Sequence, residues 1–162
     1  MHGLMREGRR EPVLYSTHIY EKGSAMAGLK ASRQDWRVCK SIFVADDDAT
    51  ANRYAKTREG PYGFYYWNLL TKRLARGGAN IYKPDLSMPD SALTVEFLLD
   101  TLVIAGSVNS VVDQILKFRE IVGDFGTLMY VGHDWADVPL ARRSMELMAE
   151  KVMPAVNAAI GA

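Results

Sequence analysis

The chain is poor in the residues that proteins use to cross-link themselves or to hold metal ions. Its 162 residues include a single cysteine, Cys39, and three histidines, at positions 2, 18 and 133. One cysteine excludes an internal disulfide framework, and the scattered histidines have no spacing typical of a structural zinc site. We therefore expect a reducing, cytoplasmic environment and no metal site.

Charge of one sign and long apolar runs are missing too. Lys and Arg total 20 and Asp and Glu total 19, a formal net charge of +1, so no broad basic field could hold nucleic acid. No apolar run approaches the roughly 20 residues of a membrane-spanning helix. Residues 1–11 carry charge and lack the apolar core of a secretory signal. We expect neither a nucleic acid nor a membrane partner.

The overall composition is typical of a globular protein. Hydrophobic residues make up 48% and charged residues 24%, as in an ordinary soluble domain. Residues 1–34 show weak periodicity, so we predict an irregular amino-terminal segment with a short strand around Pro12–Tyr20. Residues 35–162 form the predicted ordered domain.

Three stretches predict strands of a buried sheet. Trp36–Ala45 changes from alternating to continuously apolar, and Leu102–Ala105 and Thr127–Val131 are short and apolar throughout. Continuously apolar strands are typical of a parallel sheet covered by helices on both faces, so the predicted fold class is α/β. A helix predicted from Val108 to Val122 makes the last two strands a βαβ unit.

Acidic residues, prolines and glycines mark where the other helices begin and end. Asp46-Asp47-Asp48 suits the start of a helix to about Glu59 better than a metal cluster, because matching His or Glu partners are missing. Asp137 is expected to cap the last helix, which Pro154 bends or ends. Further helices are predicted over 62–78 and 91–100, with a lid-like loop or insertion over 79–90.

Two short stretches are candidates for a ligand site. Met129–Trp135 reads MYVGHDW, an apolar strand that stops at a glycine and is followed at once by side chains able to bind a ligand or transfer protons. Neighbouring parallel strands end at the same edge of a sheet, where α/β proteins bind ligands. Gly106-Ser107 and Gly132–Trp135 are therefore predicted to emerge side by side.

Each candidate residue also has a structural interpretation. Gly106 and Ser107 precede a helix and could seat a phosphate on free amides, or form a tight turn with Ser107 as the N-cap. His133 could exchange protons near neutral pH, or be a structural residue at a strand end. Trp135 could stack on a ring system or pack in the core.

Two other features have more than one interpretation. The aromatic run Tyr62–Trp67 could line an apolar pocket, form an oligomer interface or pack in the interior. Cys39 lies inside a strand pattern and is expected to be buried and inert. The sequence contains no Ser/His/Asp order, P-loop or GxGxxG fingerprint.

Three segments, in this order, resemble one protein family. They are WRVCKSIFVADDDATA from Trp36, LVIAGSVNSVVDQILKFREIVGDFGTLMYVGHDWAD from Leu102 and RRSMELMAEKVMPAVN from Arg142. Together they look like the carboxyl-terminal part of the bacterial luciferase-like flavin-dependent monooxygenases, particularly the limonene and alkanal monooxygenase-like branch. The resemblance covers about Trp36 to Ile160.

The resemblance implies a fold, a cofactor and a set of site residues. The family folds as a (β/α)₈ barrel with an insertion, takes reduced FMN from a separate reductase and uses O₂ to oxygenate an apolar small molecule. By resemblance, His133 is the candidate catalytic residue, and Gly106, Ser107, His133 and Trp135 are candidate cofactor-binding residues. Because the flavin carries the difficult chemistry, such a protein needs no nucleophile or metal set of its own.

The length does not match a complete barrel, which needs roughly 250 residues. We therefore predict parallel βα units resembling the carboxyl-terminal portion of a TIM barrel, incomplete. The chain could be a fragment that needs an amino-terminal-half partner, or a short homologue that forms a homo-oligomer to cover open sheet edges. It could also be a non-catalytic flavin-binding or structural homologue.

Overall fold

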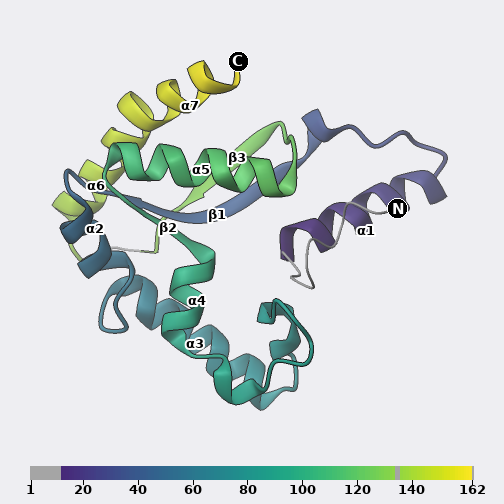
Figure 1. Ribbon diagram of the computed structural model, residues 1–162, viewed down its shortest axis with the longest axis horizontal. Helices are drawn as coiled ribbons and strands as arrows, with labels where there is room; N and C mark the ends of the chain where they lie inside the picture. Colours follow the sequence, from purple (N-terminus) through teal and green to yellow (C-terminus); the bar gives the residue numbers. More distant parts are fainter. Residues whose placement is uncertain (1–11, 134–135, 162) are drawn as a thin grey trace.

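In the computed structural model, which describes residues 12–133 and 136–161, helices surround a three-stranded parallel sheet (Figure 1). The predicted α/β class is therefore confirmed. The strands are β1 (Arg37–Val44), β2 (Val103–Gly106) and β3 (Thr127–Val131). The helices are α1 (Pro12–Met26), α2 (Asp48–Ala55), α3 (Pro61–Ala75), α4 (Val95–Leu102), α5 (Val108–Val122), α6 (Val138–Leu147) and α7 (Met153–Ile160), with short 3₁₀ turns at Arg33–Asp35, Ala79–Tyr82 and Asp90–Ala92.

The strand order is β2-β1-β3, which puts β1 in the middle. Ser41–Val44 of β1 pairs with β2, and Arg37–Ser41 pairs with β3, both in parallel. The prediction that β2 and β3 lie side by side is therefore wrong, because short apolar strands carry no pattern that selects one neighbour over another. Gly106 ends β2 and His133 follows β3. These strands lie on opposite sides of β1, two strand spacings of about 4.8 Å apart.

The two faces of the sheet carry separate apolar cores. Successive side chains of β1 point to opposite faces, so Phe43 packs with α2, α3 and α4, whereas Ile42 and Val44 pack with α5 and the carboxyl-terminal helices. Figure 1 shows α5 and α7 above the sheet and α3 and α4 below it. Fully buried side chains of the two cores include Phe43, Tyr62, Leu98, Leu99, Ile42, Val44, Val111 and Val152.

The edge of the sheet is less covered than the sequence predicts. β3 has no fully buried residue, and Met129 in its middle is 45% exposed. Cys39, predicted to be buried, is exposed, with its Sγ 3.6 Å from Sδ of Met129. Both residues share the face of Phe43, but the α3–α4 core does not reach this end of β1. The prediction of a buried thiol is therefore wrong.

The amino-terminal segment contains a helix where a short strand was expected. Pro12–Met26 forms α1, so the strand predicted around Pro12–Tyr20 is wrong. A strand must find a neighbour for its backbone hydrogen bonds, and this segment lies outside the three-stranded sheet. A helix satisfies these groups within itself. Arg33, on the 3₁₀ turn before β1, pairs with Glu21 of this helix at 3.4 Å.

The carboxyl-terminal helices begin at the predicted cap, and a π-helical turn precedes Pro154. The Asp137 carboxylate accepts a hydrogen bond from the Leu140 amide at 3.0 Å and caps α6. Between α6 and α7, Met148–Val152 forms a π-helical turn. Pro154 has no amide to donate, and its ring crowds the carbonyl four residues earlier, so a local widening of the helix is the physical consequence.

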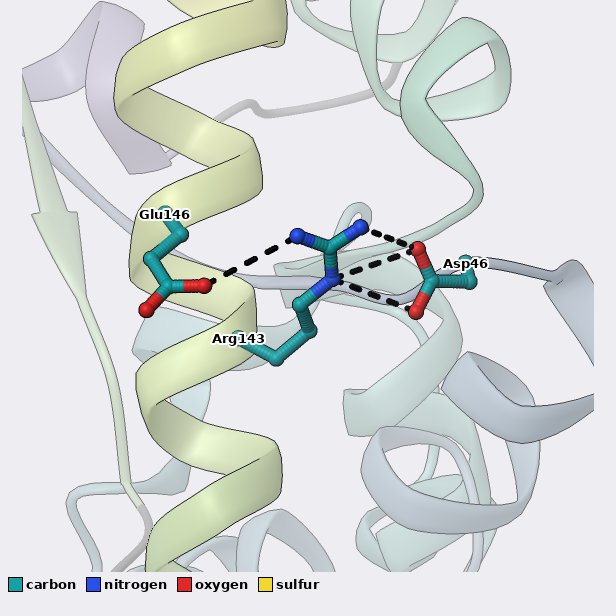
Figure 2. A network of polar contacts seen from close by, with 3 residues as sticks. All are labelled: Asp46, Arg143 and Glu146. Carbon is teal, nitrogen blue, oxygen red and sulfur yellow. Dashed lines mark hydrogen bonds and ion pairs between the residues drawn. The ribbon is translucent and has the colours of Figure 1, made fainter.

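Asp46 and Asp47, which follow β1, form contacts with different partners. Asp47 caps α2 by accepting from the Thr50 amide at 2.7 Å, which confirms the predicted helix start. Asp46 forms an ion pair with Arg143 of α6, and Arg143 also reaches Glu146 (Figure 2). Hydrogen bonds from the Arg143 guanidinium lower the pKa of the Asp46 carboxyl below its ordinary value. These contacts fasten α6 to the carboxyl end of β1.

Candidate functional site

His133 lies over β1 and takes part in a chain of three polar side chains. Its Nε2 is 2.6 Å from Oγ of Ser41, and the same Oγ is 2.8 Å from the hydroxyl of Tyr66. Ser41 comes from the middle of β1 and Tyr66 from α3, and both are buried. The last strand therefore does deliver His133 to a polar cluster, on the face of the sheet that carries Phe43.

Aromatic rings of α3 surround the imidazole. The Tyr65 ring stacks on His133 with centroids 3.9 Å apart and planes 17° apart. Tyr62 and Tyr66 meet the imidazole edge-on, at centroid distances of 5.1 and 5.9 Å. Stacked and edge-to-face contacts of this kind are favourable ring geometries. They hold His133 between the sheet and α3.

A change in backbone pairing lets His133 fold over the sheet. In a continued parallel ladder, His133 would be the next residue of β3 to bond β1, through the carbonyl of Ile42 and the amide of Val44. Instead, the Tyr62 hydroxyl donates to the Ile42 carbonyl at 2.6 Å. The Ser144 hydroxyl accepts from the Val44 amide at 2.8 Å. The side chains of Tyr62 and Ser144 thus replace the two backbone hydrogen bonds that His133 would have formed, and the end of β3 separates from β1.

Burial controls the protonation of this cluster. It disfavours the charged imidazolium and lowers the pKa of His133 below 6.5. Burial also raises the pKa of Tyr66 to about 12, despite the opposing hydrogen bond with Ser41. The pKa of Tyr62 rises further for the same reason. At neutral pH His133 is therefore a neutral imidazole beside two protonated phenols.

The other predicted site, Gly106-Ser107, has its backbone donor already in use. Ser107 is the N-cap residue of α5, and its amide donates to Oδ1 of Asp48 at 2.6 Å. This bond, with those from the hydroxyls of Ser110 and Ser107, lowers the pKa of Asp48. A Cβ at Gly106 would come within 2.7 Å of Ser110 Cβ and 2.8 Å of Asp48 Oδ1, so close packing requires glycine here. The Asp48 carboxylate therefore occupies the position at the Ser107 amide that one interpretation of the sequence assigned to a phosphate.

The aromatic run divides between the core and the surface. Tyr62 and Tyr66 are buried, whereas Phe64, Tyr65 and Trp67 are 65%, 42% and 41% exposed. Local sequence patterns do not distinguish Ser41, Tyr62, Tyr66, Asp48 or Ser144 individually as site residues. A usable signal existed for the tyrosines, because positions 62 and 66 fall on one helical face. Trp135 lies outside the described residues.

Within residues 12–133 and 136–161, no cluster of His, Cys, Asp and Glu side chains is large enough to hold a metal ion. The helices of the same described segments are all too short or too polar to cross a bilayer.

Two known proteins that are similar to the chain in sequence are monooxygenases. The chain is 30% identical over 140 residues to 3,6-diketocamphane 1,6-monooxygenase of Pseudomonas putida, covering 85% of this chain and 36% of that protein. It is 29% identical over 144 residues to limonene 1,2-monooxygenase of Rhodococcus erythropolis, covering 88% and 34%. No model of a known protein family matches the chain.

A solved structure of a monooxygenase is also similar to the chain in fold. It is the oxygenating constituent of 3,6-diketocamphane monooxygenase from Pseudomonas putida, a type II Baeyer-Villiger monooxygenase in complex with FMN. The TM-score is 0.71 at 28% sequence identity, over 88% of this chain and 39% of that chain. The chain thus spans little more than a third of the length of these relatives. Its fold is a parallel α/β sheet that resembles part of a luciferase-like monooxygenase barrel.

Proposed function

We propose that this chain is the carboxyl-terminal part of a luciferase-like, FMN-dependent monooxygenase that oxygenates an apolar small molecule. The observation that supports this most strongly is the similarity in fold to an FMN-bound monooxygenase over 88% of the chain. Residues 35–162 would be the barrel-derived part. Reduced FMN would come from a separate reductase, and O₂ would be the co-substrate.

The His133 cluster suits the apolar part of such a site. His133 lies on the sheet face that carries Cys39, Ser41 and Phe43, and Tyr65 stacks on its ring. Neutral imidazole beside tyrosine rings offers an apolar surface with few polar groups, as ligand pockets for small molecules do. His133 would contact the ligand directly, and Trp135 would rim the flavin.

The residues proposed for the flavin phosphate do not fit it as they are arranged. Asp48 accepts the Ser107 amide, so a phosphate at Gly106-Ser107 would meet a carboxylate of like charge. The flavin phosphate would bind at Gly106-Ser107 only if the Asp48 side chain turned away. Otherwise other barrel strands would have to supply the phosphate site. Reduced FMN, when bound, supplies the oxygen chemistry. The described residues supply the apolar wall and a hydrogen-bonding imidazole.

Flavin titration tests this proposal. We expect the purified chain to bind dithionite-reduced flavin under anaerobic conditions with saturable, micromolar affinity, followed by absorbance and fluorescence. FMN should bind no more tightly than riboflavin, because the Asp48 carboxylate at the Ser107 amide repels the phosphate of FMN. Asp48→Asn should favour FMN over riboflavin, since the asparagine side chain carries no charge and can turn away from the Ser107 amide.

Glu150→Gln, which neutralises an exposed carboxylate elsewhere, serves as the control and should leave the FMN-to-riboflavin ratio unchanged. Absence of binding of either flavin in either redox state would contradict the proposal. That result would favour the second candidate, a non-catalytic structural homologue.

The strand order is a specific observation in favour of that second candidate. Consecutive strands of a (β/α)₈ barrel are neighbours, with each strand followed by its helix. Here β3 pairs with β1 and leaves β2 on the far side. In this chain β3 therefore occupies the edge of β1 that would pair with another strand in a complete barrel.

Self-association is expected in either case. Among the described residues β3 is an edge strand, and Cys39 and Met129 beside that edge are exposed. Edge strands pair readily with other chains. Multi-angle light scattering at micromolar concentration should give at least twice the mass of one chain. Met129→Lys should shift the protein toward monomer, whereas Met153→Lys, at a 52% exposed position of α7, should not. A strictly monomeric wild-type protein would refute this prediction.

A further inference from the structure

We infer that Ser41 and Tyr66 are positioning residues that fix His133 as the tautomer protonated on Nδ1, so that His133 presents a hydrogen-bond donor to a ligand. The three side chains form one line of contacts, from the Tyr66 hydroxyl to Ser41 Oγ at 2.8 Å and from Ser41 Oγ to His133 Nε2 at 2.6 Å. Each hydroxyl has one proton and two lone pairs. If Ser41 accepted from both neighbours, its own buried proton would have no acceptor among the described residues, so the line runs in one of two directions.

Burial of Tyr66 decides between the two directions. If Nε2 carried the proton, it would donate to Ser41, and Ser41 would donate to Tyr66. The Tyr66 proton would then need a further acceptor, and among the residues the structure describes Ser41 is the polar partner of this hydroxyl. Tyr66 is only 6% exposed. A buried hydroxyl proton without an acceptor is costly, so Tyr66 donates to Ser41.

The direction of the line then sets the state of the imidazole. Ser41 Oγ accepts from Tyr66, and its own proton points to Nε2, which must be unprotonated to accept it. In a neutral imidazole the proton then lies on Nδ1. No described residue forms a hydrogen bond to Nδ1. The lowered pKa of His133 is consistent with a ring that stays neutral.

This arrangement determines what His133 can do. Nε2 is occupied by the Ser41 proton, so the ring cannot accept a proton at neutral pH without breaking that bond. Nδ1–H can donate to an oxygen or nitrogen acceptor of a ligand. His133 therefore acts as a hydrogen-bond donor rather than a general base. Use of this donor by a ligand rests on the proposed function, whereas the tautomer itself does not.

Nuclear magnetic resonance of the ¹⁵N-histidine-labelled full chain tests the inference without any flavin. Long-range ¹H–¹⁵N spectra at pH 8 distinguish the protonated ring nitrogen from the unprotonated one, and His133→Gln assigns the signal among the three histidines. We expect wild-type His133 to be protonated almost entirely on Nδ1. Tyr66→Phe, which keeps the ring, should give a mixture of tautomers, and Ser41→Ala should move the proton mainly to Nε2.

Two variants provide controls. Tyr65→Phe removes a hydroxyl from the ring stacked on His133 but not from the line of contacts, so the tautomer should not change. Ser41→Thr keeps a hydroxyl at the same position and should keep the Nδ1 tautomer. A wild-type ring protonated on Nε2, or a Tyr66→Phe spectrum identical to wild type, would overturn the inference. Failure of flavin binding would leave it intact.

Discussion

Replacing Tyr62 with alanine is expected to lower the free energy of unfolding by about 3–5 kcal/mol, the range for removing a large aromatic side chain from a core. Tyr62 is fully buried and is the largest such side chain of the described residues. Its ring packs edge-on against Phe43 at 5.9 Å and His133 at 5.1 Å. The loss would open a cavity between α3 and β1. Urea unfolding followed by circular dichroism measures it.

Tyr62→Phe separates the hydroxyl from the ring. It keeps the packing but leaves the Ile42 carbonyl without its donor, and an unsatisfied buried carbonyl costs about 1–3 kcal/mol. Phe64→Ala, on the same helix but 65% exposed, is the control and should change stability by no more than about 0.5 kcal/mol. Equal losses for Tyr62→Ala and Phe64→Ala would show that α3 does not pack as described.

Gly126→Ala is expected to lower the free energy of unfolding by more than about 3 kcal/mol, at least as much as overpacking a core does. A Cβ at this position would overlap the backbone carbonyl of Gln34. Backbone cannot rotate away as a side chain can, so the turn before β3 must move. That turn holds Gly126 to the Trp36 carbonyl at 3.1 Å and starts the pairing of β3 with β1.

Gly23→Ala is the matched control for this substitution. Gly23 lies in α1, and a Cβ there would meet nothing within 4 Å. Alanine in a helix interior is favoured over glycine by about 1 kcal/mol, so this variant should be neutral or slightly stabilised. Thermal unfolding of both variants compares them directly. A Gly126→Ala protein as stable as wild type would refute the close approach of Gln34.

Local patterns were sufficient to predict most of the secondary structure. Asp47 and Asp137 cap helices where a carboxylate before a helical pattern predicts a cap. Val111, Ile115 and Val122 are buried on one face of α5, as their helical spacing predicts. These features depend on residues within a few positions of one another, and such information is present in a single sequence.

The candidate site was predicted only in part for the same reason. His133 was identified because it follows an apolar strand and a glycine, both local signals. Ser41 and Tyr66 are 92 and 67 positions away from it along the chain, and only packing of α3 on the sheet brings them together. Asp48 accepts the hydrogen bond of the Ser107 amide, although the two residues are 59 positions apart in the sequence. No local pattern reports such contacts.

The sequence by itself determined the α/β class, the three strands of the sheet and the approximate extent of the helices after β1, because hydrophobic period and caps act locally. The tertiary structure alone decided the order β2-β1-β3, the exposure of Cys39 at an open end of the sheet and the turn of His133 over Ser41. Strand order depends on which edge is free when each short strand pairs. The turn of His133 depends on two hydroxyls, of Tyr62 and Ser144, which take the backbone groups that β3 would otherwise have bonded.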